Sequence, residues 1–480
     1  MGPTSSREVT QMKEVEIEQN KILLVRNEGK FSAVSGLCTH YGAPLIKGAL
    51  VGNRVRCPWH GACFNTTTGD IEEFPGLDCL HSYKVHLRTS KTTKRVKEMS
   101  SRGPGVCHTV LLIGGGPASL QCAETLRQNK YGGRIIMVIK DEKLPIDKTK
   151  LSKVVSVNTE GKVVTFSDGT TQPYDQLLVS TGARARALQV PGAEMENVKL
   201  LESYKDAAGI YQMSVGNKVV IVGTSFIGME VAAYLSDKAA SVAVVGKSEF
   251  PYQLSLGPDI GKMTMKMLEE KNVKFYMNSG VAEMRGENGR VKEVVLQNGD
   301  VLQADVVISG IGVIPNSDFL KGSAVEVDSR NAVVVDKFMR TNIPDVFAAG
   351  DVVSFPLALR EDKMVQIGHW QLAQAHGRVA ALNMLKKQTE INSVPYFWTV
   401  LLGKSIRYTG YGEGYTDIVF KGNVEEMKFL AFYIKGDEAV AAASLNFDPA
   451  VSKVAELMAS GQKITKSQAE SQDLAWLQLP

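Results

Sequence analysis

The fold is decided by HTVLLIGGGPASLQCAETLRQ, residues 108–128, in which an apolar run leads through a glycine-rich turn into a helical pattern. A strand that ends in such a turn and continues at once as a helix points backbone N–H groups and the helix N-terminus at a bound pyrophosphate. Gly114 and Gly116 form the turn, and Ser119 stands where a dinucleotide fingerprint has its third small residue. This stretch predicts the first half of a dinucleotide-binding α/β domain.

A second unit of the same kind is KVVIVGTSFIGMEVAAYLSDK, residues 218–238, which begins 110 residues after the first begins. Gly223 and Gly228 are its fingerprint glycines, and Ser225 stands where the second glycine is usual. The long spacing indicates two nucleotide-binding halves rather than a short-period repeat.

The residues that would hold the two adenosine riboses differ between the units. In the first unit Asp141 follows the second strand, RIIMVI, and is placed to hold a ribose. In the second unit SVAVV is followed by Gly246 and Lys247, where an NAD site normally has an acidic residue. A lysine there tolerates a 2′-phosphate, so the sequence favours NADPH over NADH. The alternative is that Lys247 is a surface residue and that Glu249 holds the ribose.

Two cysteine–histidine pairs lie upstream, in CTHYGAPLIKG (38–48) and CPWHGACFN (57–65). Structural zinc usually takes paired cysteines or paired histidines from one knuckle. Here each loop supplies one Cys and one His, which matches a Rieske [2Fe–2S] centre, where two thiolates hold one iron and two imidazoles hold the other. The alternatives are zinc and chance pairs on a β fold. The predicted metal ligands are Cys38, His40, Cys57 and His60.

Several motifs together resemble a known family. GGGPAS (114–119), STGAR (180–184), GTSFIGME (223–230), GIGVIPN (310–316) and AAGD (348–351) occur in the order typical of FAD- and NAD(P)H-dependent pyridine-nucleotide oxidoreductases. The resemblance is extended by LPIDKTKLSK (144–153), IGHWQLAQAHGRVAA (367–381), PYFWT (395–399) and GKSIRYTGYGEG (403–414). The chain thus resembles the apoptosis-inducing-factor-like proteins of the Rieske-containing kind.

The resemblance implies which residues contact the nucleotides. His369 and His376 could otherwise be read as metal ligands, but neither has a Cys or an acidic partner nearby in sequence. The residues implied for FAD are Gly114, Gly116, Asp141, Lys153, Thr181, Gly182, Arg184, Gly350, Asp351, His369 and Trp370. Those implied for NAD(P)H are Gly223, Gly228, Glu230 and Gly312.

The second Cys–His loop, CPWHGACFNTTTGDIEEFPG (57–76), also resembles the Rieske ferredoxins. High-potential members of that family join their two loops by a disulfide. Here Cys63 lies in the second loop, but the first has Ala43 and no partner cysteine. We therefore expect Cys63 to be a packed thiol and the centre to be of the lower-potential, ferredoxin-like kind.

The expected architecture is an α/β flavoprotein with two dinucleotide-binding (Rossmann-like) domains, preceded by a small all-β Rieske domain and followed by an α+β C-terminal domain. Short strands separated by turns indicate the all-β unit, and a polar Gly/Pro-containing segment after it indicates a linker. The predicted boundaries are 1–88 for the Rieske domain, 89–107 for the linker, 108–210 and 333–395 for the FAD-binding domain, 211–332 for the NAD(P)-binding domain and 396–480 for the C-terminal domain.

The chain departs from the family after Lys153. It runs directly into VVSVNTEGKVVTFSDG (154–169), an antiparallel hairpin pattern, whereas a nucleotide-binding half needs a βαβαβ unit with a crossover of about a dozen residues. The family has a helix and a third parallel strand here. We expect the FAD sheet to lack an interior strand, so that either VVSVN replaces it or the FAD site is damaged.

Composition restricts the partners. The net charge of +4, from 55 basic and 51 acidic residues, gives no reason to expect nucleic acid. We find no apolar run long enough to cross a bilayer and no secretory leader. Six irregularly spaced cysteines favour a reducing compartment. The predicted location is the cytoplasm, with mitochondrial association as the alternative.

The predicted function is an oxidoreductase. NAD(P)H would pass a hydride to FAD, which would pass single electrons through a mobile linker to the Rieske centre and on to an unidentified acceptor. No catalytic side chain is predicted, because no C-x-x-C lies near a flavin motif. One alternative is a redox-sensing or pro-apoptotic interaction protein with little turnover. In that case nucleotide binding would change its shape or its dimerisation to a homodimer. Another is a variant with an intact Rieske domain and a largely broken flavoprotein.

Overall fold

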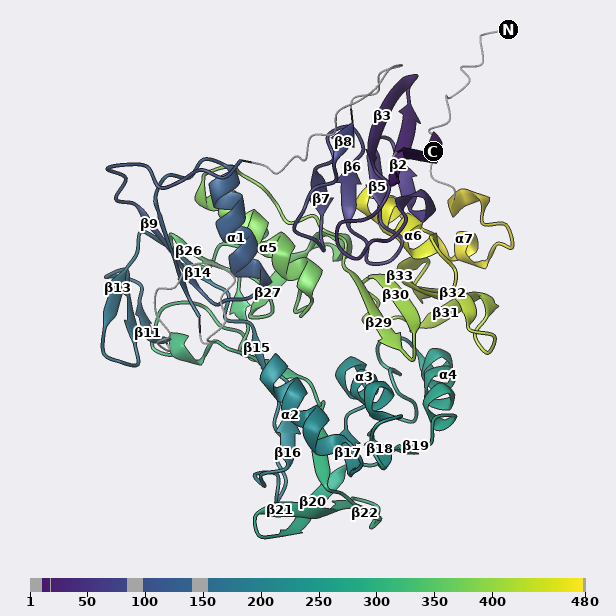
Figure 1. The fold of residues 1–480 in the computed structure, drawn as a ribbon. Coiled ribbons are helices and arrows are strands. Elements are labelled where there is room, and N and C mark those ends of the chain that lie inside the picture. The colour runs from purple at the N-terminus through teal and green to yellow at the C-terminus, as the bar shows by residue number, and fades with distance from the viewer. Residues whose placement is uncertain (1–10, 18, 84–97, 140–153, 478–480) are drawn as a thin grey trace.

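A computed structural model describes residues 11–17, 19–83, 98–139 and 154–477 of the chain (Figure 1). Asp141 and Lys153, both predicted to contact FAD, lie outside these residues, as does the part of the predicted linker before residue 98. Among the described helices none is both long enough and apolar enough to span a bilayer.

The N-terminal domain consists of two small sheets that enclose one core. Leu23, Val34, Leu45, Val55 and Phe64 are fully buried in it. The all-β prediction for this region is therefore confirmed. The first sheet has the order β1 (Gln11–Ile17), β2 (Asn20–Asn27), β3 (Lys30–Ser35), β8 (Ser82–Tyr83), and the second has β4 (Ala49–Val51), β5 (Arg54–Arg56), β6 (Cys63–Asn65), β7 (Ile71–Glu73).

The FAD-binding domain is built on a four-stranded parallel sheet. Its order is β10 (Arg134–Val138), β9 (Thr109–Ile113), β14 (Gln176–Val179), β26 (Val346–Ala348). The apolar strand β9 is central and almost fully buried, as expected of a parallel strand covered on both faces. Helices α1 (Pro117–Gln128) and α5 (Trp370–Met384) lie side by side (Figure 1). Their backbones approach closely, since a Cβ on Gly377 would lie 2.1 Å from the Ala118 carbonyl oxygen.

The prediction that the shortened segment removes an interior strand is wrong. In the usual strand order the third strand lies beside the second, at the sheet edge. The second strand here is β10, and in the described part of the chain it is itself the edge strand. VVSVN does not replace the third strand, because it forms β11 (Val154–Asn158) of a separate antiparallel sheet with β12 (Val163–Phe166) and β13 (Thr171–Pro173). The predicted hairpin is thus confirmed and the interior of the parallel sheet is continuous.

The NAD(P)-binding domain has a five-stranded parallel sheet. Its order is β16 (Val198–Leu200), β23 (Val306–Ser309), β17 (Lys218–Val222), β18 (Ser241–Val245), β19 (Val273–Tyr276). The predicted boundary at 211 is wrong, because β16 and helix α2 (Tyr204–Ser214) already belong to this domain. The remaining elements are α3 (Phe226–Leu235), α4 (Pro258–Glu269) and the antiparallel β20 (Val281–Glu287), β21 (Arg290–Leu296), β22 (Val301–Gln303).

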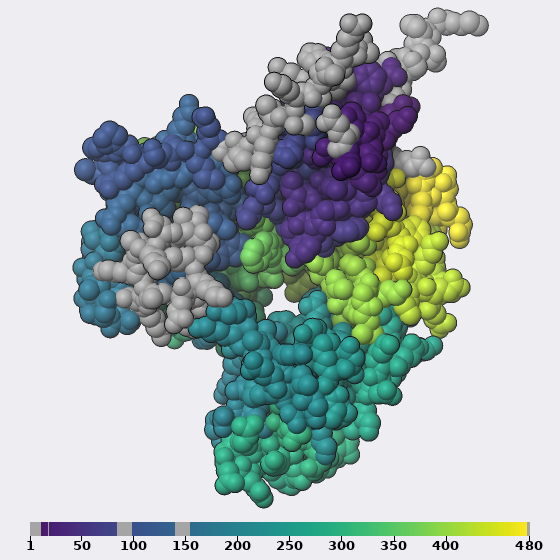
Figure 2. Space-filling model, in the orientation of Figure 1, coloured from purple at the N-terminus to yellow at the C-terminus, as the bar shows by residue number. Residues whose placement is uncertain are grey.

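The C-terminal domain is a five-stranded antiparallel sheet with helices on one side, as predicted. Its order is β29 (Tyr396–Leu401), β30 (Lys404–Gly410), β33 (Glu438–Leu445), β32 (Lys428–Lys435), β31 (Asp417–Asn423), with α6 (Ala450–Ala459) and α7 (Lys466–Glu470). The N-terminal domain, purple in Figure 2, contacts this yellow-green domain. The teal NAD(P)-binding domain lies below both in this view. Two smaller sheets complete the fold. β15 (Ala183–Ala185) pairs with β24 (Val313–Pro315), and within the FAD-binding domain β25 (Val333–Val334) pairs with β27 (Val353–Leu357), which also pairs with β28 (Lys363–Val365).

The α1–α5 contact predicts opposite effects for two glycine substitutions. Gly377→Ala places a methyl group against backbone and should cost about 1–3 kcal/mol of stability. Gly209→Ala, inside α2 with open space around it, should instead stabilise by about 0.5–1 kcal/mol. Thermal unfolding of the two variants measures this, and equal shifts in Tm would contradict the close contact.

Candidate iron–sulfur and flavin site

The two Cys–His loops have the same backbone geometry. Cys38 follows β3 and Cys57 follows β5, and the N–H of each cysteine donates to the carbonyl oxygen five residues later at 2.8 Å. The glycine four residues after each cysteine, Gly42 or Gly61, has a φ of 73° or 76°, which a side chain would strain. The glycines therefore allow both loops to fold back on their cysteine.

The two cysteine sulfurs differ in acidity: the pKa of Cys38 is lowered, whereas the hydrogen bond with Cys38 and burial raise the pKa of Cys57 well above its ordinary value. Cys38 and Cys57 are buried, and the backbone N–H groups two and three residues after each cysteine donate to its sulfur. A hydrogen bond from Cys57 is the main cause that lowers the pKa of Cys38. Donors to sulfur stabilise the anionic form that binds iron and also set the potential of a cluster.

The two histidines face each other. His40 Nδ1 lies 3.1 Å from His60 Nδ1, and burial lowers the pKa of His60 to about 3, helped by the charges of His40 and Arg407. The imidazoles are therefore neutral, which is the form that binds metals. At this separation both nitrogens can reach one metal atom at the usual distance of about 2.0–2.1 Å.

The ligands come together as two pairs rather than as one centre. In the described ranges no group of three or more His, Cys, Asp or Glu side chains is arranged around a single metal ion. A [2Fe–2S] cluster needs only two protein ligands on each iron. The geometry of Cys38, His40, Cys57 and His60 thus fits a Rieske cluster better than a zinc ion.

The prediction for Cys63 as a packed thiol is confirmed. All six cysteines of the chain are free, and Cys63 is fully buried. Its Sγ donates to Glu456 Oε1 at 3.2 Å, and burial raises its pKa well above the ordinary value. Cys63 therefore has a structural partner in another domain instead of a disulfide.

Trp398 of β29 lies between the histidine pair and the flavin motif. Its ring centroid is 4.1 Å from that of His60 and 5.9 Å from that of His40. On the other side it is 5.7 Å from His369, the residue that precedes α5. Trp398 lies in the PYFWT motif of the family resemblance but was not among the predicted site residues.

The alternation of β29 explains these contacts, because successive side chains of a strand point to opposite faces. Trp398 contacts the Rieske histidines, and Tyr396, on the same face, covers Gly61, where a Cβ would lie 2.6 Å from the tyrosine ring. Phe397 and Thr399 point the other way, to the NAD(P)-binding domain. There Phe397 contacts Phe226 of α3, with ring centroids 5.0 Å apart.

The first glycine turn has the form that a pyrophosphate requires. A Cβ on Gly114 would lie 2.1 Å from the Ser180 carbonyl oxygen, so this position must be glycine. A Cβ on Gly116, which precedes α1, would meet no atom within 4 Å, and the turn is open there. Ser119 is buried and hydrogen-bonded to Ser180 Oγ at 2.5 Å, so serine is accommodated as the third small residue.

The STGAR and GIGVIPN motifs are joined in the structure. Thr181 Oγ1 donates to the Asn316 carbonyl oxygen at 2.7 Å, and Asn316 N–H donates to the Gly182 carbonyl oxygen at 3.0 Å. Arg184 pairs with Asp318 at 2.9 Å. Gly182 and Gly312 both have open space at the Cβ position. Asn316 and Asp318 thus connect the FAD-binding and NAD(P)-binding domains, a role that the sequence did not reveal.

Polar groups without a partner remain around the start of α5. Asp351 follows Gly350, and burial raises the pKa of its carboxyl. His369 Nδ1 is buried with no hydrogen-bond partner among the described residues, and burial lowers the pKa of His369 to about 4. Such groups fit a bound molecule with hydroxyl and ring donors, as FAD has. Trp370 is 57% exposed, whereas His376 is buried and accepts from the Gly350 N–H at 3.3 Å.

The second glycine turn repeats the first. A Cβ on Gly223 would lie 2.2 Å from the Gly310 carbonyl oxygen, and one on Gly228 would lie 2.0 Å from that of Gly223. Glu230, on α3, accepts a 2.6 Å hydrogen bond from Thr399 Oγ1. The residue predicted to lie near the nicotinamide is therefore tied to the strand that carries Trp398.

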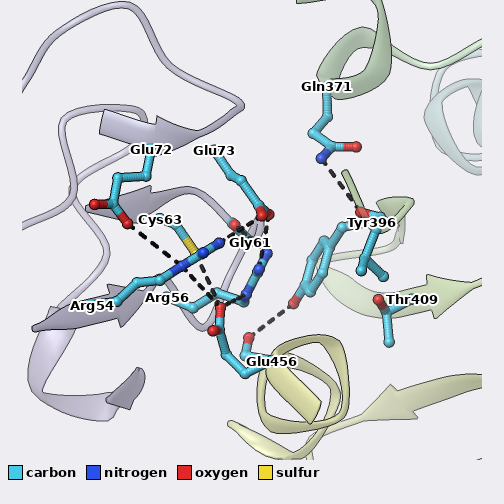
Figure 3. A network of polar contacts seen from close by, with 12 residues as sticks. Arg54, Arg56, Gly61, Cys63, Glu72, Glu73, Gln371, Tyr396, Thr409 and Glu456 are labelled. Carbon is cyan, nitrogen blue, oxygen red and sulfur yellow. Dashed lines mark hydrogen bonds and ion pairs between the residues drawn. The ribbon is translucent and has the colours of Figure 1, made fainter. Parts of the chain in front are cut away.

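The Rieske domain is held to the C-terminal domain by a buried ionic cluster (Figure 3). Arg56 is fully buried and donates through Nε to Glu456 Oε1 of α6 at 2.5 Å and through Nη2 to Glu73 Oε2 at 2.8 Å. Arg54 donates to Glu73 Oε1 at 2.6 Å. Burial opposes ionisation of Glu73, but Arg56 and Arg54 hold its pKa below the ordinary value. Nothing in the sequence pattern indicated this pairing.

Comparison with known proteins identifies the families to which parts of the chain belong. Three family models match: the Rieske [2Fe-2S] domain over residues 3–84, the pyridine nucleotide-disulphide oxidoreductase domain over 145–377 and the reductase C-terminal domain over 396–476. A ferredoxin reductase of the CYP199A2 system from Rhodopseudomonas palustris superimposes with a TM-score of 0.72 at 25% identity, covering 77% of this chain and 99% of that one. The fold and matches define an FAD- and NAD-dependent oxidoreductase with an N-terminal Rieske domain.

Relatives define the family more closely. Human apoptosis-inducing factor 3 is 46% identical over 97% of this chain and 86% of its own length, and the mouse protein is 45% identical over the same shares. Rubredoxin-NAD(+) reductase of Pseudomonas putida is 28% identical over 70% of this chain and 95% of its own. The chain belongs to the apoptosis-inducing factor 3 family, and its cofactors are a [2Fe–2S] cluster, FAD and a nicotinamide dinucleotide.

The comparisons also agree with a shortened segment. The alignment with the human protein spans 519 residues, which exceeds the 480 of this chain by 39, so the human protein has at least 39 residues without a counterpart here. The oxidoreductase model matches only from residue 145, downstream of the first glycine turn.

The ionic cluster predicts an acid-dependent loss of stability. Because the pKa of Glu73 is lowered in the folded protein, its stabilising contribution is complete above its ordinary value of 4.5 and is lost as pH falls through the lower folded value. Glu73→Gln should cost about 3 kcal/mol at pH 7. The Tm difference from the unsubstituted chain should narrow below pH 4.5.

The exposed Glu16→Gln, on β1 of the same domain, is the matched control and should leave Tm unchanged. A Tm difference for Glu73→Gln that stays constant from pH 7 to pH 3 would contradict the assignment.

Proposed function

We propose that the chain transfers electrons from NAD(P)H through FAD to its own Rieske cluster, with Cys38, His40, Cys57 and His60 as the cluster ligands. The observation that carries the proposal is the continuous aromatic contact from His60 through Trp398 to His369. When bound, FAD accepts a hydride from the nicotinamide and releases electrons singly, which the cluster can accept. The proposal thus extends the oxidoreductase class to a specific internal route.

The chain's own residues hold the two redox groups in fixed positions. Gly114 and Gly116 would receive the pyrophosphate of FAD, Asp351 its ribitol hydroxyls, and the N-terminus of α5 the polar edge of its ring. Trp398 lies between His60 and His369, the residue that precedes this helix. Because Tyr396 covers Gly61 from the same face of β29, the loop with His60 cannot move away without separating two packed surfaces.

FAD binding is compatible with the shortened segment. The first glycine turn leaves the end of β9, which lies between β10 and β14, so the loss of an edge strand does not remove it. Thr181, Gly182 and Arg184 follow β14, the other neighbour of β9, and are held by Asn316 and Asp318. The assignments of Asp141 and Lys153 remain predictions.

The cytoplasmic location and the homodimer also remain predictions, and no acceptor beyond the cluster is assigned. An interaction role is the second candidate, since the relatives named apoptosis-inducing factor 3 are so similar. The Glu230–Thr399 hydrogen bond favours it, because it connects the nucleotide site with β29 and through Trp398 with the Rieske domain. Light scattering with and without NADH tests this candidate: a change of mass or size with little turnover supports it.

The route through Trp398 predicts a specific kinetic defect. Trp398→Ala should slow NADH-driven cluster reduction about tenfold or more, the change expected for about 1.4 kcal/mol in barrier height, without slowing flavin reduction. Stopped-flow absorbance separates the two steps. Trp476→Phe, at a partly buried position that packs against Phe432 in the same domain, is the control. Equal loss of both steps, or no loss, would argue against the route.

Nucleotide preference is tested at the end of β18. Lys247 and Glu249 are both exposed there, and no carboxylate directly follows the strand. If Lys247 receives the 2′-phosphate, Lys247→Glu should raise the KM for NADPH about tenfold relative to that for NADH. Lys262→Glu on α4 should change neither KM. If the protein prefers NADH and the Lys247→Glu variant keeps the same preference, the ribose is assigned to Glu249 instead.

A further inference from the structure

The surface of the C-terminal domain that contacts the Rieske domain is specialised to hold the second cluster loop. Arg407 Nε donates to the Trp59 carbonyl oxygen at 3.1 Å, and Ser452 Oγ donates to the Cys57 carbonyl oxygen at 3.1 Å. Arg407 is itself held by Asp448 at 2.9 Å. Two carbonyl groups of one loop thus accept from another domain, and this fixes the backbone that carries His60.

The ionic contact between Arg56 and Glu456 locks this arrangement. Arg56 uses its remaining donors on Glu73 and on the Gly61 carbonyl oxygen at 3.0 Å, and Glu456 also accepts from Cys63. Glu456 is 5% exposed. When one partner of such a buried pair is removed, the other is left as an uncompensated charge, which is strongly unfavourable. When the two domains separate, Arg56 and Glu456 therefore lose their ion pair and both have to be rehydrated.

We propose that the face formed by Trp398, Arg407, Ser452 and Glu456 is a docking surface for a [2Fe–2S] domain, and that the chain's own Rieske domain occupies it permanently and excludes free ferredoxins. The exclusion of free ferredoxins rests on the proposed electron transfer from flavin to cluster. Any other iron–sulfur protein that takes electrons from the flavin by way of His369 would have to contact Trp398. While His60 lies against that ring, the position is filled.

Covalent attachment strengthens the exclusion. A tethered domain has an effective concentration on the order of millimolar, which a free competitor has to exceed. The fit is also close, because the Gly61–Tyr396 contact leaves no room even for a methyl group. Glu456 is accordingly a positioning residue, which acts on the cluster through Arg56 and Cys63.

The test uses the full chain with FAD and cluster, and compares Glu456→Gln with Glu425→Gln, an exposed glutamate of the same domain. The substitution at 456 should raise the undocked population at least about 100-fold, since it breaks a buried ion pair. Small-angle scattering should then show a larger radius of gyration for Glu456→Gln only. Unchanged radii for both variants would overturn the lock.

A second readout addresses the exclusion. With NADH, the unsubstituted chain should reduce an added soluble [2Fe–2S] ferredoxin slowly, and Glu456→Gln should do so at least about tenfold faster. Its own cluster should be reduced more slowly. Rapid reduction of the added ferredoxin by the unsubstituted chain would overturn the exclusion.

If Glu456→Gln loses its cluster spectrum, the pair Arg407→Gln and Ser452→Ala tests the same surface from the side that leaves the Rieske domain unaltered. Both should enlarge the radius of gyration, and normal radii would refute the docking surface. If the unsubstituted chain fails to reduce its own cluster, the proposed function is wrong, whereas the scattering result still decides whether the lock exists.

Discussion

Strand β29 has two faces, and the alternation of its side chains determines how the domains meet. Tyr396 and Trp398 face the Rieske domain, and Phe397 and Thr399 face the NAD(P)-binding domain. A shift of one residue would exchange the two sets and turn the tryptophan ring away from His60. Antiparallel pairing with β30, from Tyr396 with Thr409 to Leu401 with Lys404, fixes the register. The proposed internal route thus depends on backbone hydrogen bonds within the C-terminal domain.

The predictable parts of the site are those in which the chemistry is local. Each cluster loop combines ligand, turn glycine and backbone acceptor within a few residues, so Cys38 and Cys57 could be recognised directly. The glycine turns are similar, because a positive φ and a close approach leave glycine as the residue that fits. Arg56 and Glu456 could not be paired beforehand, because 400 residues separate them and only the docking of two domains brings them together. A strand as short as β16 gave no pattern from which its sheet could be assigned.

The shortened segment had a smaller effect on the sheet than its length suggested. Parallel sheets of this kind are built outward from the strand that carries the glycine turn, with the third strand at the periphery. Without the third strand, β10 has β9 as its one neighbour in the described sheet, whereas β9 keeps both of its neighbours, β10 and β14. The error in the prediction came from treating order along the chain as order across the sheet.

Under the proposed function, the contact between Trp398 and His60 makes electron transfer a step within one molecule. Where a reductase and its ferredoxin diffuse separately, the rate of transfer depends on how much of each is present and falls on dilution. In the proposed transfer, donor and acceptor occur in a ratio of one to one, and the step is unimolecular. A cell that makes this chain therefore sets the supply of electrons by one expression level, and no imbalance between two proteins can arise.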